Sequence, residues 1–345
     1  MTTQLSPEQT AAPAPPPQSR WHGLPLESIW RNLALVGVLA VLFAIGAVIR
    51  PDLYGDPDWV VNNMLVILQQ ASAIGVITVG MTFVIIGGGI DLSVGALIAL
   101  AGVWSTTVAT QSFGPLGMIF TALAVGTIAG SVNGVLIAYG RLVPFIATLA
   151  MLVAARGLAA QISGKQTQVS ADQFINSIAA TRLAGIPMLV IILAGVAVLG
   201  WILLNRTTFG RRTVAIGSNP EAARLAGINV RRHTLLLYAL SGLCCGIAAI
   251  MLTSLATSSQ AAAAELYELD AIAAAIIGGT LLSGGRGTIV GSMFGVIVFS
   301  AITNLFAIAN LPTEVQNMVK GGIIVLAVLI QQFRYSSLTA LFRRA

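Results

Sequence analysis

An almost unbroken run of apolar residues, from Leu33 to Gln331, constrains this chain more than any other feature. A helix needs about 20 apolar residues to cross the hydrocarbon layer of a membrane, so the run is long enough for about ten crossings. Charged residues make up only 9% of the chain and the mean hydropathy is +0.89, which excludes an ordinary soluble protein. The sequence therefore predicts an all-α, polytopic membrane protein.

Charges, prolines and glycines divide the run into ten candidate spans. Their approximate bounds are Leu33–Ile49, Val60–Ile86, Leu92–Thr110, Leu116–Ala138, Phe145–Ile162, Met188–Leu204, Leu235–Leu255, Leu269–Leu282, Ile289–Ala309 and Val315–Ile330. We expect a disordered cytoplasmic tail over residues 1–30, which is polar and rich in Ala and Pro, a transmembrane domain over 31–333, and a second cytoplasmic tail over 334–345.

The distribution of Lys and Arg predicts the orientation, because cytoplasmic loops carry the positive excess. With both termini inside, only Arg50, Lys165 and Arg182 lie in outside loops. The cytoplasmic segments then hold the other loop cations, namely Arg20, Arg31, Arg141, Arg206, Arg211, Arg212, Arg224, Arg231, Arg232, Arg286, Arg334, Arg343 and Arg344. The net charge of +6 reflects this loop bias, and we expect no binding to nucleic acid.

The chain carries no chemistry of its own that we can identify. It lacks the G-x-x-x-x-G-K-[ST] motif, so it does not bind ATP through a P-loop, and the energy for any pumping must come from elsewhere. His22 and His233 flank spans and form no metal constellation. We therefore expect no enzyme activity, no metal and no cofactor in this chain.

A basic loop between two spans, Gly210 to Val230, is the strongest candidate for contact with a soluble partner. Within it, SNPEAARLAG is typical of one short helix. Either Ser218 and Glu221 form a capping box, or Asn219 caps the helix with Pro220 at its first position; Gly227 then ends it. A helix of about two turns is not stable alone and must lie against something. We favour docking over the alternative, an ordinary loop packed on its own membrane domain.

Two spans are interrupted by glycine, at Ile85–Asp91 and at Ile276–Thr280. Broken helices survive in a membrane only where protein or a water-lined cavity satisfies the freed backbone groups, and transporters often place their pathways there. Both breaks contain I-I-G-G, which is weak evidence for an internal duplication. Glycines also recur every four residues elsewhere, as Gly126, Gly130 and Gly134, as Gly242 and Gly246, and as Gly291 and Gly295, which indicates close helix packing.

A few polar residues fall within apolar sequence. Asp91 is a functional candidate because burying its charge is costly, but we favour a role as a cap for the helix that starts beside it. Asn133, Asn304 and Thr148 could face a solute pathway, although hydrogen bonding between helices is the favoured interpretation. Lys320 could reach outward or pair with an acid.

Five blocks, taken together and in order, resemble the permease subunits of bacterial ABC importers of the ribose-type sugar group. They are GMTFVIIGGGIDLSVGALIAL (80–100), PFIATLAML with the Arg-Gly pair after it (144–157), AIGSNPEAARLAGINV (215–230), YELDAIAAAIIGGTLLSGG (267–285) and VKGGIIVLAVLI (319–330). The resemblance covers nearly everything after Asn62. The chain departs from it in the Pro-rich tail and in the outside loop Ser163–Ile186.

The resemblance implies a pair of permease subunits in a bacterial inner membrane, identical or paralogous, with two cytoplasmic ATPases that bind ATP and Mg²⁺ and a periplasmic binding protein. The cargo would be a monosaccharide such as ribose, xylose or galactofuranose, or a polyol, moved by alternating access. The implied ATPase-coupling residues are Ser218, Asn219, Pro220, Glu221, Ala222, Ala223, Arg224 and Gly227. Candidate pathway residues are Gly87, Gly88, Gly89, Asp91, Ser93, Asn133, Phe145, Thr148, Gly278, Gly279 and Asn304.

Two other functions remain open from the sequence. An ion-coupled secondary transporter of a small neutral solute would also contain broken helices, but it would normally need membrane acids, of which Asp91 is the strongest candidate. A membrane scaffold or receptor without transport is the second alternative.

Overall fold

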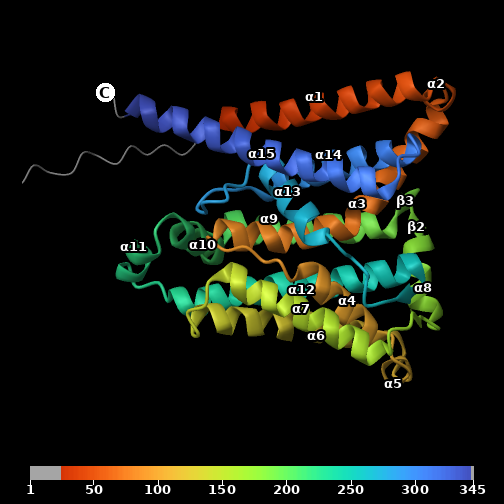
Figure 1. Ribbon diagram of the computed structural model, residues 1–345, viewed down its shortest axis with the longest axis horizontal. Helices are drawn as coiled ribbons and strands as arrows, with labels where there is room; N and C mark the ends of the chain where they lie inside the picture. Colours follow the sequence, from red (N-terminus) through yellow and green to blue (C-terminus); the bar gives the residue numbers. More distant parts are fainter. Residues whose placement is uncertain (1–24, 343–345) are drawn as a thin grey trace, which may run out of the picture.

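A computed structural model describes the backbone of residues 25–342 and the side chains of residues 32–329, and it is a bundle of long helices lying side by side (Figure 1). Seven described helices are long and apolar enough to cross a membrane, which confirms an all-α membrane protein. They are α1 (Pro25–Ile49), α3 (Pro57–Ile86), α6 (Gly114–Ala138), α7 (Pro144–Ser163), α9 (Met188–Arg206), α12 (Val230–Ala256) and α14 (Ile289–Ile308).

The other three predicted spans correspond to α4 (Val94–Ser105), α13 (Tyr267–Ile277) and α15 (Thr313–Phe342). The first two have only 12 and 11 residues. At 1.5 Å per residue they are about 18 and 16 Å long, roughly half of the hydrocarbon thickness. Ten complete crossings therefore remain a prediction, because two of the ten candidates are half-length helices continued by extended chain.

Short elements occupy the two ends of the bundle. At one end lie α10 (Thr208–Ser218) and α11 (Pro220–Leu225); we name it the α11 end (Figure 1). The opposite end, named the α8 end, carries α2 (Pro51–Tyr54), α5 (Val108–Gln111) and α8 (Gln173–Ala180), with the two-residue strands β1 (Gln168–Val169), β2 (Arg182–Leu183), β3 (Ile186–Pro187) and β4 (Ser258–Ser259). Strand β1 pairs antiparallel with β4, and β2 with β3.

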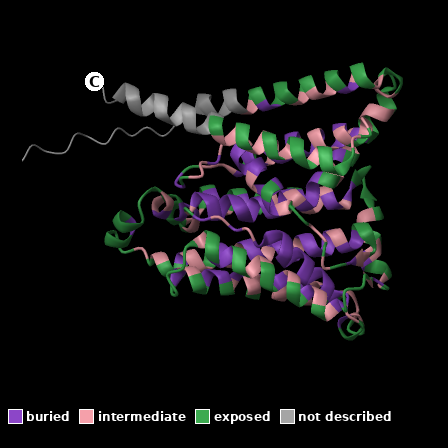
Figure 2. Ribbon diagram, viewed as in Figure 1, coloured by how far each residue is buried: buried purple, intermediate pink, exposed green. Residues whose placement is uncertain are grey.

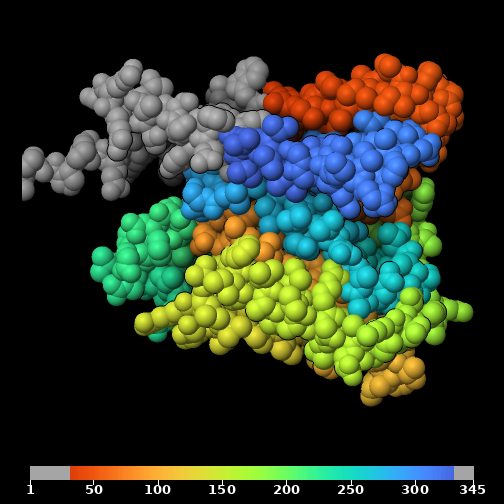
Figure 3. Space-filling view, in the orientation of Figure 1, coloured from red at the N-terminus to blue at the C-terminus, as the bar shows by residue number. Residues whose placement is uncertain are grey.

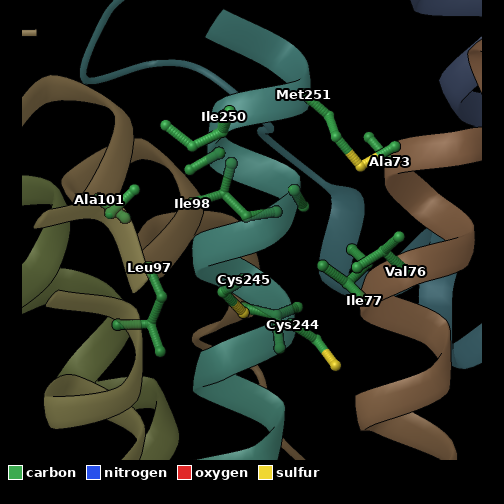
Figure 4. Packing of buried hydrophobic residues seen from close by; sticks show 14 of the residues in the cluster. Ala73, Val76, Ile77, Leu97, Ile98, Ala101, Cys244, Cys245, Ile250 and Met251 are labelled. Carbon is green, nitrogen blue, oxygen red and sulfur yellow. The ribbon is translucent and has the colours of Figure 1, made fainter. Parts of the chain in front are cut away.

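The core is built around α12, which packs between α3 and α4 (Figure 4). Ala73 and Val76 of α3, Leu97 of α4 and Cys245 of α12 are all buried in one apolar cluster. Figure 2 shows the consequence: α3, α4 and α12 are mostly buried, whereas α1, α6 and α7 present exposed faces. Exposed apolar side chains such as Phe120, Ile128 and Val153 on these outer helices suit contact with lipid.

The four-residue glycine spacing produces the close packing that it predicts. A methyl group added at Gly130 of α6 would lie 2.9 Å from the Cα of Gly242, and one added at Gly134 would lie 2.7 Å from the Cα of Leu235. Side chains at these positions would force α6 and α12 apart, so the glycines set the distance between the two helices.

The loop between α7 and α9, where the chain departs from the family resemblance, is held in place by contacts with other segments. Gln111 donates a hydrogen bond to the Val169 carbonyl and accepts one from the Ala171 amide, while β1 pairs with β4 just after α12. The loop, which follows α7, is therefore tied to α5 and to the end of α12.

Candidate functional site

The predicted docking helix forms as α11, and one of the two predicted caps is realised. The Asn219 side chain accepts a hydrogen bond from the Ala222 amide at 3.0 Å, and Pro220 occupies the first turn. Ser218 is instead the last residue of α10, where its hydroxyl donates to the Val214 carbonyl. Gly227 ends the helix with a φ of +82°, a conformation that favours glycine.

The segment before α11 is helical, contrary to the expectation of a loop from Gly210 onward. Helix α10 runs from Thr208 to Ser218. Thr207 caps its start, because the Thr207 hydroxyl accepts a hydrogen bond from the Gly210 amide. The Thr213 hydroxyl lies 2.8 Å from Nε2 of the buried His233, and the ring of Phe209 lies 4.5 Å from the imidazole. These contacts hold α10 against the start of α12, and α11 follows directly from the end of α10.

Helix α11 itself is almost entirely exposed and projects beyond the bundle (Figure 3). Only Ala223 is buried, and Glu221 forms an exposed ion pair with Arg224 at 2.9 Å. Leu225, which the sequence analysis did not select, is 80% exposed. Leu225 is the only large apolar side chain on this polar, solvent-facing helix. That contrast is the sequence feature that could have identified it.

The first break, between α3 and α4, is held by a buried hydrogen-bond network around Asp91. One carboxyl oxygen accepts from the amide and hydroxyl of Ser93 at 3.0 and 2.6 Å, and the other accepts from the Ser241 hydroxyl at 2.9 Å. Asn133 donates to the Ser93 hydroxyl at 2.8 Å. Asp91 is 0% exposed and bonds to Ser93 and to Ser241 of α12, while Asn133 of α6 joins the network through Ser93.

This network refines the helix-cap interpretation of Asp91. Ser93 is the residue that immediately precedes α4, and its side chain makes no capping bond. Asp91 instead accepts from the backbone amide of Ser93 itself and also bridges to Ser241 of α12. Thr148 is equally buried and its hydroxyl points to the Ile90 carbonyl at 3.4 Å, whereas Phe145, one turn earlier, is 51% exposed.

The second break, between α13 and α14, contains the remaining pathway candidates. A methyl group at Gly278 would lie 2.5 Å from the Ser292 amide nitrogen, so α13 ends in tight contact with α14. Gly279 has a φ of +88°, and Asn304 is buried further along α14. The structure thus brings Asp91, Ser93, Asn133 and Thr148 together at the first break. The other candidates, Gly278, Gly279 and Asn304, lie at the end of α13 and on α14.

The two half-length helices meet at their N-terminal turns, between the two ends of the bundle (Figure 1). A methyl group at Gly95 of α4 would lie 2.5 Å from Oε2 of Glu268, the second residue of α13, and 3.5 Å from Nη2 of Arg156. Arg156 also donates to the Ala261 and Ala263 carbonyls, both at 2.6 Å. Arg156 therefore holds the turns before α13 against the start of α4, with Glu268 beside it.

A cavity of about 160 Å³ lies beside this segment. Its lining is neutral: α4 contributes Gly102, α12 contributes Thr253, β4 contributes Ser259 and α13 contributes Tyr267. Among the described residues, no group of three or more His, Cys, Asp or Glu side chains could hold a metal ion.

Lys320 pairs with an acid, which was one of its two predicted roles. Its Nζ lies 3.3 Å from Oδ2 of Asp270, and the two side chains are 18% and 7% exposed. Lys320→Met should leave Asp270 buried without a counter-charge and lower the free energy of unfolding by about 3–5 kcal/mol. Thermal unfolding of the purified protein in detergent measures this.

The chain offers a matched control for that experiment. Its only other lysine, Lys165, is exposed in a loop, so Lys165→Met should unfold like the wild type. Combining Lys320→Met with Asp270→Asn should recover most of the loss, since no unpaired charge then remains. Unchanged unfolding of Lys320→Met would show that the ion pair contributes nothing.

Comparison with known proteins decides the family. Residues 63–328 match the family described as "Branched-chain amino acid transport system / permease component". The chain belongs to this permease family. The match includes both helix breaks, α10, α11 and every predicted coupling and pathway residue.

Several members of the permease family are similar over nearly their whole length. The ribose import permease protein RbsC of Bacillus subtilis (strain 168) is 41% identical over 321 residues, which cover 91% of this chain and 96% of the relative. RbsC of Escherichia coli (strain K12) is 38% identical, with coverage of 85% and 91%. The L-arabinose ABC transporter permease protein AraH of Azospirillum brasilense is 34% identical, with coverage of 96% and 95%. No solved structure matches the chain significantly.

Proposed function

We propose that this chain is the membrane-spanning permease subunit of an ATP-binding-cassette importer that carries a neutral monosaccharide or polyol into the cytoplasm. The observation that carries the proposal is α11: a capped helix outside the bundle, with an apolar residue 80% exposed, in a chain that matches sugar importer permeases along its length. A cytoplasmic ATPase would cover that residue.

The orientation follows from the same assignment. The α11 end is cytoplasmic, in agreement with its arginines, and the α8 end with β1 to β4 faces the periplasm, where a binding protein delivers the sugar. The N- and C-termini are cytoplasmic, and a second permease subunit, either this chain or a paralogue, completes the pathway. ATP and Mg²⁺ belong to the partner, and the chain itself catalyses nothing.

Neutral cargo agrees with how the buried charges are used. Asp91 is satisfied by Ser93 and Ser241, and Asp270 by Lys320. These acids hold helices together within one subunit, which disfavours the ion-coupled transporter. Hydroxyl groups, such as those that line the cavity beside α4, suit a sugar better than an ion.

The decisive experiment is purification of the tagged chain in mild detergent from its own host, with mass spectrometry of the copurifying proteins. We expect an ABC ATPase, together with one permease sequence or two. The double variant Glu221→Arg, Gly227→Pro should lose the ATPase and sugar uptake while remaining in the membrane. A folded, monodisperse chain without an ATPase would contradict the proposal, as would normal uptake by a well-expressed double variant.

A further inference from the structure

Three glycine-containing segments, far apart in the sequence, meet at the α11 end. They are residues 86–88 at the end of α3, residues 217–218 at the end of α10, and residues 284–285 between α13 and α14; we name them the glycine junction. The Gly285 amide donates to the Ile86 carbonyl at 2.8 Å. A methyl group at Gly284 would lie 2.9 Å from the Gly217 carbonyl oxygen and 3.0 Å from the Cα of Gly88.

The junction has no room for side chains at Gly217, Gly284 and Gly285. A methyl group at Gly217 would overlap the Ile86 carbonyl oxygen and lie 2.6 Å from the Gly285 nitrogen. Gly284 and Gly285 also have φ angles of +83° and +75°, which side-chain-bearing residues rarely adopt. The three segments therefore touch mainly backbone to backbone, and the side chain beside Gly285, that of Ser218, is too short to absorb much displacement.

Each segment leads to an element of the candidate site. Residues 86–88 continue through Asp91 into the half-helix α4, and residues 284–285 follow the half-helix α13. Residues 217–218 are separated from α11 by Asn219 alone. A displacement of α11 consequently reaches both half-helices through direct contact, without passing through the core around α12.

We propose that the glycine junction transmits the displacement of α11 to α4 and α13, and that Gly217 is the positioning residue on which this coupling depends. The proposal rests on the proposed function, because an ATPase must displace α11. Gly217 lies inside α10, where alanine is a better helix former than glycine. Contact across the junction, and not helix propensity, therefore explains why residue 217 is a glycine.

The test is Gly217→Ala in the assembled complex of permease, ATPase and binding protein, reconstituted in vesicles. We measure sugar imported and ATP hydrolysed. Import should fall about tenfold while the ATPase remains bound and active, so that more ATP is hydrolysed per sugar. A purely structural defect would instead lower assembly, hydrolysis and import together.

Two glycines in helices provide matched controls. A methyl group at Gly157 of α7 or Gly195 of α9 would meet nothing within 4 Å, so Gly157→Ala and Gly195→Ala should keep the wild-type ratio of ATP to sugar. A wild-type ratio of ATP to sugar in Gly217→Ala would overturn the proposal about the glycine junction and leave the proposed function intact. Absence of ATP-dependent import by the wild-type complex would overturn both proposals.

A second measurement leaves the glycines intact. Ser218 and Ser283 are exposed at the junction, and Leu183 is exposed at the α8 end. The distance between spin labels on Ser218→Cys and Ser283→Cys should be the same in nucleotide-free and ATP-bound complexes. The distance between labels on Ser218→Cys and Leu183→Cys should differ between the two complexes. A change in the distance within the first pair, or no change in the distance within the second pair, would overturn the proposal.

Discussion

Leu225→Asp is expected to release the ATPase from the permease and to lower sugar uptake at least about thirtyfold. A buried apolar anchor at the centre of an interface is often worth 2 kcal/mol or more, and a carboxylate in its place would be desolvated without a partner. Because Leu225 is 80% exposed in the free subunit, the substitution removes little packing within the chain. Copurification of the ATPase and uptake of labelled sugar in cells measure the two effects.

Two variants make the result specific to this surface. Leu225→Met conserves volume and apolar character and should retain ATPase binding. Val169→Asp changes a residue of similar exposure, 68%, at the opposite end of the bundle, and should also retain it. ATPase binding by Leu225→Asp at the wild-type level would exclude α11 as the main contact.

Substitution of Asp91 should weaken both the fold and the start of α4. Asp91→Ala removes three hydrogen bonds and leaves the hydroxyls of Ser93 and Ser241 without this buried acceptor. We expect a loss of about 2–4 kcal/mol, comparable to the disruption of other buried polar networks. Thermal unfolding in detergent and the amount of protein in the membrane measure this loss.

Asp91→Asn separates structure from charge. The amide has nearly the same shape, can accept from Ser93 with its oxygen and can donate to the Ser241 hydroxyl with its nitrogen. If Asp91 only anchors α4, this variant should keep most of the uptake. A stable Asp91→Asn protein without uptake would instead show that the carboxyl group itself acts in transport.

Features encoded by neighbouring residues could be predicted from the sequence. The apolar run indicates the spans, and the cap and stop of α11 depend on residues within one short stretch, Asn219 to Gly227. The close approach of α6 and α12 was likewise readable, because glycines spaced by four residues fall on one face of a helix.

Contacts between distant residues could not be predicted. Asp91 and Ser241 are 150 positions apart, and Lys320 and Asp270 are 50 apart, so nothing local indicates either partner. Helix α10 was missed because Gly210 and Gly217 resemble loop residues. Both are glycine for a tertiary reason: added methyl groups would overlap the Leu204 and Ile86 carbonyl oxygens, respectively.

The head-to-head contact of α4 and α13 also sets the electrostatic potential inside the bundle. The N-terminus of a helix carries about half a positive charge, and the first turn of α13 holds two acids, Glu268 and Asp270, beside these two helix ends. The backbone thereby lowers the cost of keeping carboxyl groups buried at this point of the bundle.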